Sequence, residues 1–195
     1  GNSIDNTNNI IKRNLNRIAK YVSESDNGIY DAMNKGIRMA TGDVIGILNS
    51  DDIYADENVL SDVMSQFQSN PHLKLLYGDL VYVNNDDINK VVRKWRSKPF
   101  SSTFFEYANV PPHPSLFVTS DVYRKCGLFN TQYKLAADYD FMLRAFKKFG
   151  CVSVYLPRLM VKMRLGGATN KSIRNILNGN KEILSSWKKN GLKAP

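Results

Sequence analysis

The sequence is poor in the residues that build metal clusters and disulfide frameworks, because its 195 residues include only two cysteines and two histidines. Cys126 and Cys151 lack zinc-ligand spacing, and their apolar neighbours favour buried free thiols over a disulfide. No apolar run reaches the roughly 18 residues of a membrane-spanning helix, and no signal-peptide pattern opens the sequence. With 43% apolar residues, residues 1–195 fit one domain, and a cytoplasmic location is the default expectation.

Acidic residues are scarce in the C-terminal part of the chain. Residues 1–140 hold 15 Lys and Arg against 17 Asp and Glu, whereas residues 141–195 hold 12 against 1. The net charge of +9 therefore resides near the C-terminus, where it would suit nucleic acid, an anionic membrane surface or a pyrophosphate-bearing molecule. Because neither a zinc-finger spacing nor an RNA-recognition aromatic signature accompanies it, we expect no nucleic-acid partner.

The first half of the chain alternates between helical and strand patterns. Apolar periodicity predicts a helix capped by Asp5 or Thr7, then helices over 30–40 and 57–69. A short strand at 21–22 and a buried strand at 44–48 lie between them. This alternation implies a parallel sheet with right-handed crossovers.

The second half changes character. Residues 75–83 and 88–95 are predicted to form a hairpin, so the sheet becomes mixed. Further strands are expected at 115–119, 151–156 and 159–164, and further helices at 121–126, 137–149 and 170–189. The predicted fold class is α/β, with a mixed, mostly parallel central sheet flanked by helices.

An acidic turn follows the strand at 44–48. The apolar run stops at Asn49, Ser50, Asp51 and Asp52, and open α/β sheets hold their ligands at the carboxyl ends of their strands. Hard oxygen ligands suit Mg²⁺ or Mn²⁺. The alternative is that Asp51 and Asp52 only cap the following turn, which is the commoner role for an isolated Ser-Asp-Asp.

Several motifs occur along the chain in a specific order. They are the block from Ser23 to Asp52, Leu76-Tyr77-Gly78-Asp79-Leu80, Pro112-His113-Pro114-Ser115, Gly127-Leu128-Phe129-Asn130, Ala136-Ala137-Asp138-Tyr139-Asp140 and Met163-Arg164-Leu165-Gly166-Gly167. Together they resemble the family 2 inverting glycosyltransferases, enzymes of the GT-A (nucleotide-diphospho-sugar transferase) fold, over nearly the whole chain.

The resemblance implies a metal-dependent transferase. Such an enzyme moves a sugar with inversion from a nucleoside diphosphate, here taken to be UDP, to a saccharide or lipid-linked acceptor in bacterial cell-surface polysaccharide biosynthesis. The expected cofactor is a divalent cation, Mg²⁺ or Mn²⁺.

One departure from the family concerns the start of the chain. Family members usually open with a strand-helix-strand segment before a Gly-Asn-Ser-like turn, and this sequence begins at that turn with Gly1. The resemblance therefore implies a GT-A domain lacking that first segment. Residues 1–110 would form a truncated nucleotide-sugar half, and residues 111–195 an acceptor half with a basic C-terminal helix. The competing hypothesis is a catalytically incompetent module that acts only in nucleotide or protein binding.

The resemblance also assigns the acidic residues. Asp52 would be the metal ligand, with Asp51 beside it contacting the ribose or a metal-bound water. Asn49 stands where the family often has an acid, which predicts modest metal affinity. Asp138 would be the general base that deprotonates the acceptor hydroxyl, and the alternative is a helix N-cap. Asp140 points to a different side of the predicted helix and is expected to be structural.

Further residues are assigned to substrate binding. Asp26, Tyr30, Asp31 and Lys35 match a segment that lines the nucleotide pocket in relatives, although Asp31 and Lys35, spaced i,i+4, would also form a surface ion pair.

Two more residues lie near the C-terminal motifs. His113, in a stiff proline-flanked loop, is expected to contact the acceptor or to be structural. Arg164, beside Gly166 and Gly167, is expected to clamp the diphosphate.

The basic C-terminal helix has two possible roles. Its apolar positions, including Ile176, Leu177, Ile183, Leu184 and Trp187, could pack against the domain, or they could bind anionic lipid at the membrane surface. Both roles are compatible with one helix.

Overall fold

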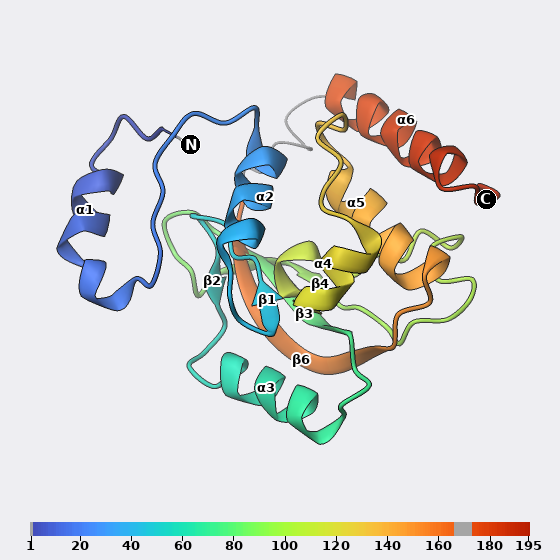
Figure 1. Cartoon of the computed structure of the whole chain (residues 1–195), viewed down its shortest axis with the longest axis horizontal. Helices are drawn as coiled ribbons and strands as arrows, with labels where there is room; N and C mark the ends of the chain where they lie inside the picture. Colours follow the sequence, from blue (N-terminus) through green and yellow to red (C-terminus); the bar gives the residue numbers. More distant parts are fainter. Residues whose placement is uncertain (1, 166–172) are drawn as a thin grey trace.

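The computed structural model describes residues 2–165 and 173–195, which form a mixed α/β domain around one curled sheet (Figure 1). The strands are β1 (Val44–Gly46), β2 (Ile53–Tyr54), β3 (Leu75–Val83), β4 (Val91–Trp95), β5 (Phe117–Thr119) and β6 (Ser153–Arg164). The strand order is β1-β5-β3-β6-β2. Strand β4 pairs with the later residues of β3, on the side where β5 pairs with its first residues. Strands from both predicted halves, 1–110 and 111–195, thus share one sheet.

The helices are distributed over both faces of this sheet. They are α1 (Thr7–Arg13), α2 (Ile29–Met39), α3 (Val59–Ser69), α4 (Ser120–Cys126), α5 (Ala137–Met142) and α6 (Ile173–Lys189), with a π-helical turn, η3 (Leu143–Lys148), continuing α5. Side chains of α3 pack with Leu76, Leu80 and Phe117 on one face. Side chains of α2, α4, α5 and α6 pack with Leu75, Tyr77 and Val118 on the other. Alternation along β3 and β5 explains the two separate cores.

The expectation of a mostly parallel sheet is wrong. Within the described residues, β3 and β6 form the one parallel pair, and the other pairings are antiparallel. The hairpin accounts for the β3–β4 pairing, and β5 runs back along β3 after the long loop 96–112. Strand β1 lies at the edge of this sheet and pairs with β5 alone, so the expected buried strand at 44–48 is shorter and more exposed than its apolar sequence suggested.

Strand β6 joins two predicted strands into one. The sequence suggested a break at Pro157, but the strand continues through it, and the register with β3 shifts between Tyr77 and Leu80. Gly78 lies at this irregularity, and a Cβ there would come within 2.8 Å of the Arg158 carbonyl oxygen and of the Met160 side chain. The close approach of the two strands thus requires glycine at this position.

Other segments also differ from the sequence predictions. Residues 21–22 form no strand, and α1 buries none of its residues and stands away from the sheet in Figure 1. The predicted start of the last helix, 170–172, lies outside the described residues. Cys126 and Cys151 are buried free thiols, as predicted. Within the described residues, no helix combines the length and apolar character needed to cross a membrane.

Candidate active site

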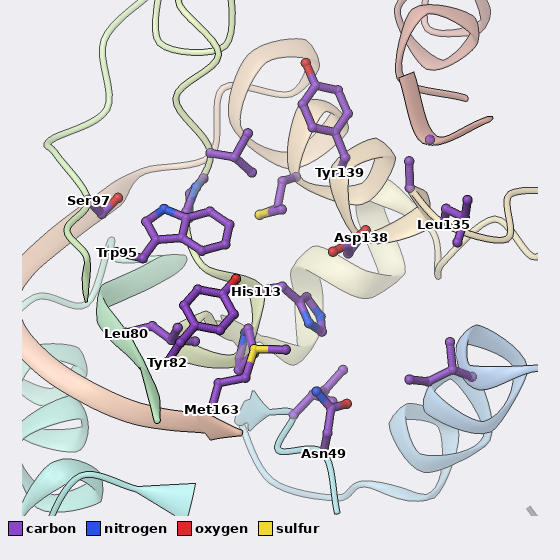
Figure 2. A pocket seen from close by; sticks show the side chains of 18 of the residues that line it. Asn49, Leu80, Tyr82, Trp95, Ser97, His113, Leu135, Asp138, Tyr139 and Met163 are labelled. Carbon is purple, nitrogen blue, oxygen red and sulfur yellow. The ribbon is translucent and has the colours of Figure 1, made fainter. Parts of the chain in front are cut away.

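A cleft of about 1300 Å³ opens between α2, the turn after β1, the β3–β4 hairpin, the segment before α5 and α6. Four predicted site residues line it: Tyr30, Asp51, His113 and Asp138. Figure 2 shows Asp138 and His113 near the middle of this cleft, with Asn49 below them. Single small-molecule sites usually occupy roughly 300–1000 Å³, so this cleft has room for more than one ligand.

Asp138 lies in the first turn of α5. Ala136 is the N-cap residue of that helix, and no side chain makes a capping hydrogen bond, so capping is not the role that the structure gives Asp138. The Tyr30 hydroxyl donates to Asp138 Oδ1 at 3.0 Å. Burial, and then the neighbouring Asp138 carboxylate, raise the pKa of Tyr30. Tyr30 therefore stays protonated and fixes one oxygen of the carboxylate.

His113 opens a short helical turn (η2, His113–Ser115) that is anchored to the sheet. The Ser115 hydroxyl contacts the carbonyl oxygens of Gly78 and Pro112 at 2.9 and 2.8 Å. The imidazole packs edge-on against Phe129. Burial lowers the pKa of His113, and the Asp138 carboxylate opposes that shift. At neutral pH the imidazole is therefore uncharged and suited to hydrogen bonding with a hydroxyl group.

The acidic turn presents its two aspartates differently. Asp51 is exposed and lines the cleft. Asp52 lies outside the cleft lining and is only 4% exposed. Its Oδ2 accepts a hydrogen bond from Asn49 Nδ2 at 2.8 Å, and its buried Oδ1 has no hydrogen-bond partner among the described residues. Burial raises the pKa of Asp52, while the hydrogen bond from Asn49 opposes the shift. Asn49 thus orients the carboxylate that the resemblance assigns to the metal.

The donor set of this turn fits a divalent cation completed by substrate. Within the described residues, no group of three or more His, Cys, Asp or Glu side chains could hold a metal. Mg²⁺, however, is commonly bound by one or two carboxylates together with phosphate oxygens. The Oδ1 of Asp52, unpartnered within the described residues, supplies one such carboxylate, and the exposed carboxylate of Asp51 is next to it in the chain.

Asp26, Asp31 and Lys35 lie outside the cleft lining. Asp26 accepts from the Gly28 N–H, and Asp31 from the Asn27 N–H, both at 3.0 Å. Lys35 pairs with Glu24 at 2.9 Å and with Asp31 at 3.7 Å, which is the surface ion pair that the i,i+4 spacing also allowed. Together these contacts hold the segment before α2 against the helix.

Arg164 also lies outside the cleft lining, although its neighbours Met163 and Leu165 belong to it. Its backbone pairs with Val83 of β3, and its buried Nε has no hydrogen-bond partner among residues 2–165 and 173–195. Gly166 and Gly167, the other members of the predicted diphosphate clamp, lie outside the described residues.

Helix α6 holds the segment that carries Asp138, a contact that the sequence reasoning missed. Glu182 accepts hydrogen bonds from the backbone N–H groups of Lys134, Leu135 and Ala136 at 2.8–2.9 Å. Trp187 donates to the Tyr139 hydroxyl at 2.8 Å. A signal was available, because Glu182 is the single acid among residues 141–195.

Asp140 belongs to a buried network rather than to the cleft. Arg144 Nε donates to Asp140 Oδ2, and Asn190 Nδ2 donates to Asp140 Oδ1, both at 2.9 Å. Arg144 also donates to the carbonyl oxygen of Leu128 at 2.7 Å. This network ties α5 to α6 and to the segment after α4, as expected for a structural aspartate.

Comparison with known proteins gives a consistent set of relatives. A family model described as "Glycosyl transferase family 2" matches residues 1–126. A PGL/p-HBAD biosynthesis glycosyltransferase of Mycobacterium tuberculosis is 26% identical over 163 residues, covering 83% of this chain and 61% of the relative. An uncharacterized glycosyltransferase of the same species is 32% identical over 128 residues, covering 65% of this chain and 47% of that protein. The chain therefore spans less than two thirds of these curated relatives.

Solved structures match over almost the whole chain. Residues 1–349 of TarS from S. aureus, in complex with UDP, match with a TM-score of 0.66 and 16% identity, covering 98% of this chain and 55% of that one. The mannosyltransferase PcManGT from Pyrobaculum calidifontis, in complex with GDP-Man and Mn²⁺, matches with a TM-score of 0.61 and 15% identity, covering 99% and 54%. At such identities the likeness establishes the fold, which is the expected GT-A fold.

Proposed function

Because the chain belongs to glycosyl transferase family 2, we propose that it transfers a sugar, with inversion, from a nucleoside diphosphate to a saccharide or lipid-linked acceptor. The observation that carries this proposal is one cleft whose lining includes Asp138, His113 and Asp51. It offers a carboxylate for the general base, an uncharged imidazole, and an acid beside the proposed metal ligand Asp52, which are groups that the reaction needs.

Asp138 acts as the general base. Tyr30 holds Oδ1, which leaves Oδ2 to take the proton of the acceptor hydroxyl. The hydroxyl oxygen forms a bond to the anomeric carbon, the bond from that carbon to the diphosphate oxygen breaks, and the diphosphate leaves with the electron pair. Fixing the carboxylate before reaction lowers the orientational part of the barrier.

Asp52 would hold the divalent cation, either Mg²⁺ or Mn²⁺, with Asp51 beside it contacting the ribose or a metal-bound water. When bound, the ion acts as a Lewis acid that neutralises charge on the diphosphate. Asn49 fixes Asp52 through a 2.8 Å hydrogen bond, so that the buried carboxylate is oriented beforehand. Among the remaining assignments, His113 contacts the acceptor, and Asp26, Asp31, Lys35 and Arg164 support the nucleotide side from outside the cleft lining.

The names of the relatives support the substrate class. TarS is described in complexes with UDP and UDP-GlcNAc, and PcManGT with GDP-Man and Mn²⁺. The mycobacterial relative is named for PGL/p-HBAD biosynthesis, which supports a role in making cell-surface glycans or glycolipids. We take UDP as the first donor nucleotide to test.

A thermal-shift series tests this proposal. The chain is heated with UDP, GDP or dTDP, with and without Mn²⁺, and transfer is then assayed with the stabilising nucleotide's sugar conjugates. A ligand at about 100 times its Kd adds roughly 2.7 kcal/mol of stability, which corresponds to a rise in Tm of roughly 5–10 °C for a chain of this size. Metal-dependent stabilisation with transfer supports the transferase. Nucleotide stabilisation without transfer favours the competing hypothesis of an incompetent binding module, and no response to any nucleotide overturns both nucleotide-based readings.

A further inference from the structure

One wall of the cleft combines aromatic rings with cations. We call it the Trp95 wall, and it consists of Tyr82, Arg93, Trp95, Arg96, Ser97 and Lys98, all of which line the cleft. Figure 2 shows Ser97, Trp95 and Tyr82 on the side across from Asp138 and Leu135. The wall comes from the β3–β4 hairpin and the first residues after it, and neither the sequence reasoning nor the proposed mechanism uses it.

Two rings of the Trp95 wall are nearly parallel. The planes of Tyr82 and Trp95 differ by 10°, and their centroids are 6.4 Å apart. The Arg93 guanidinium carbon lies 5.3 Å from the Tyr82 centroid and 6.0 Å from that of Trp95. Partly exposed aromatic rings offer apolar surface that a ring-shaped ligand can contact, and the guanidinium over both rings places positive charge at that surface.

The cations of the Trp95 wall lack acidic partners. Within the part of the chain that the structure describes, Arg93, Arg96 and Lys98 form no ion pair with a carboxylate. Residues 88–105 contain no Asp or Glu. Of the acids that line the cleft, Asp138 lies across from the wall in Figure 2. Three cations without a carboxylate partner among the described residues thus gather on the wall, and they attract an anionic group.

Ser97 adds a polar group that lacks a partner. Its backbone N–H donates to Asp79 Oδ1 at 2.9 Å, and the same oxygen accepts from the Tyr155 hydroxyl at 2.7 Å. The position of Ser97 is therefore fixed, yet its buried Oγ has no hydrogen-bond partner in the part of the chain that the structure describes, while the residue lines the cleft. A buried hydroxyl without a partner costs free energy unless a ligand or water completes it, and a sugar hydroxyl would do so.

We propose that the Trp95 wall binds a glycosyl phosphate, that is, a sugar ring joined to a phosphate group, as the acceptor-side ligand. The sugar rests on the Tyr82–Trp95 surface near Ser97, and the phosphate contacts Arg96, Lys98 and Arg93. The acceptor role rests on the proposed function, whereas binding of the glycosyl phosphate does not. Such a ligand exists both as a soluble sugar phosphate and as a lipid-linked one, and the two share the recognised chemistry.

A direct binding measurement tests the assignment. Intrinsic fluorescence is suitable because the chain has two tryptophans, of which Trp187 is fully buried against Tyr139 and Trp95 lines the cleft. The probes are glucose 1-phosphate, methyl glucoside as its neutral counterpart, and a glycosyl phosphate carrying a short lipid in micelles. We expect both phosphates to bind at least roughly tenfold more tightly than methyl glucoside. The ratio of the two Kd values shows whether the soluble or the lipid-linked phosphate is the preferred ligand. Equally tight binding of methyl glucoside overturns the proposal.

Matched variants separate this site from the donor site. The double variant R96A/K98A should weaken glucose 1-phosphate binding at least roughly tenfold. The control variant K90A/K94A removes two cations of the same hairpin region that do not line the cleft, and it should change binding less than twofold. An equal loss in the control would show general charge attraction and overturn the assignment. Thermal melts confirm that each variant is folded.

Measuring nucleotide binding distinguishes failure of this proposal from failure of the proposed function. UDP binding with Mn²⁺, measured by calorimetry, should be the same in R96A/K98A and wild type. If R96A/K98A loses UDP binding instead, the wall serves the donor diphosphate and the proposal is overturned. If wild type binds glucose 1-phosphate at the wall but binds no nucleotide, the wall stands and the transferase proposal fails.

Discussion

Glu182 of α6 accepts a hydrogen bond from the backbone N–H of Ala136, the residue that precedes α5, at 2.9 Å. The same carboxylate accepts from the N–H groups of Lys134 and Leu135. One side chain therefore satisfies three donors in succession, two residues before the candidate base Asp138. The C-terminal helix is in this way part of the support of the candidate active site.

Replacing Glu182 with glutamine should loosen this segment. The amide has one acceptor oxygen where the carboxylate has two, so at least one of the three charge-assisted hydrogen bonds is lost, and each contributes about 1.5–3 kcal/mol. We expect amide hydrogen exchange of residues 134–136 in E182Q to be at least roughly tenfold faster than in wild type, measured by mass spectrometry. Turnover should fall while nucleotide binding stays close to wild type, because Asp138 loses its fixed position.

The matched control is K181A, the neighbouring exposed residue of the same helix. It should leave exchange of residues 134–136 unchanged. Wild-type protection of these amides in E182Q would show that Glu182 does not hold the segment, whatever the effect on activity.

The sequence predicted the fold class and most helices because apolar periodicity records which face of an element is buried. It did not predict the strand pairing, since β1 and β5 run antiparallel through contacts between residues far apart in the chain, such as Ile45 and Val118. The same limit explains why two strands, 151–156 and 159–164, were predicted where β6 is continuous, because the extra residues of β6 near Pro157 are accommodated only in its pairing with β3.

For the candidate site, the sequence identified residues that lie within motifs, and it missed contacts between residues of different helices and strands. Tyr30 and Asp138 were both identified, but their hydrogen bond joins positions 108 residues apart. Trp95 and Ser97 were missed because only the folded hairpin brings them to the cleft. Asp31 and Lys35 show the opposite case, since local spacing already indicated the ion pair that the structure contains.

Replacing Asp138 or Asp140 with asparagine should have contrasting effects: the first should lower turnover, and the second should lower Tm. D138N keeps an oxygen for the Tyr30 hydroxyl, so its Tm should stay near wild type while turnover falls roughly 10²- to 10⁴-fold. D140N leaves the buried Arg144 guanidinium without a carboxylate, which costs about 3–5 kcal/mol and lowers Tm by roughly 6–20 °C. Calorimetric melts and a donor-release assay check both. A strongly destabilised D138N, or a D140N that melts like wild type, would contradict the assigned roles.

The pKa of Asp52 predicts how stability varies with pH. Burial raises that pKa above its usual value of 3.8, so the folded state binds the proton more tightly than the unfolded state. In EDTA, this carboxyl therefore lowers stability as pH rises from about 4 through the raised folded-state pKa. D52N removes the ionisation while keeping an acceptor for Asn49. We expect D52N to melt a few degrees above wild type at pH 7 and to lose that advantage at pH 4.

The control for this prediction is D51N, because Asp51 is exposed and its removal should change Tm little at either pH. Addition of Mn²⁺ with UDP should stabilise wild type more than D52N, since the variant lacks the proposed ligand charge. If D52N melts below wild type in EDTA at pH 7, the prediction is contradicted, because the ionised Asp52 carboxylate then stabilises the folded state.

Helix α6 also presents a stripe that suits an anionic membrane surface. Leu177 and Leu184 are 56% and 55% exposed, and the exposed Lys181 and Lys188 lie at the same helical face, one turn after each leucine. Trp187 faces the domain and is fully buried. The packing role and the membrane role thus use different sides of one helix, and we propose that the exposed side docks on anionic lipid.

Vesicle flotation tests this face. Apolar side chains contribute roughly 1.5–3 kcal/mol each when fully buried, so L177S/L184S should bind vesicles containing phosphatidylserine at least roughly tenfold more weakly than wild type. K181Q/K188Q should lose roughly 30-fold, at about 1 kcal/mol per cation. The matched control is L60S/M64S, which removes two apolar side chains that are 50% and 42% exposed on α3 and should bind like wild type. Equal binding of wild type to neutral phosphatidylcholine vesicles, or an equal loss in the α3 variant, would show that α6 does not direct the contact.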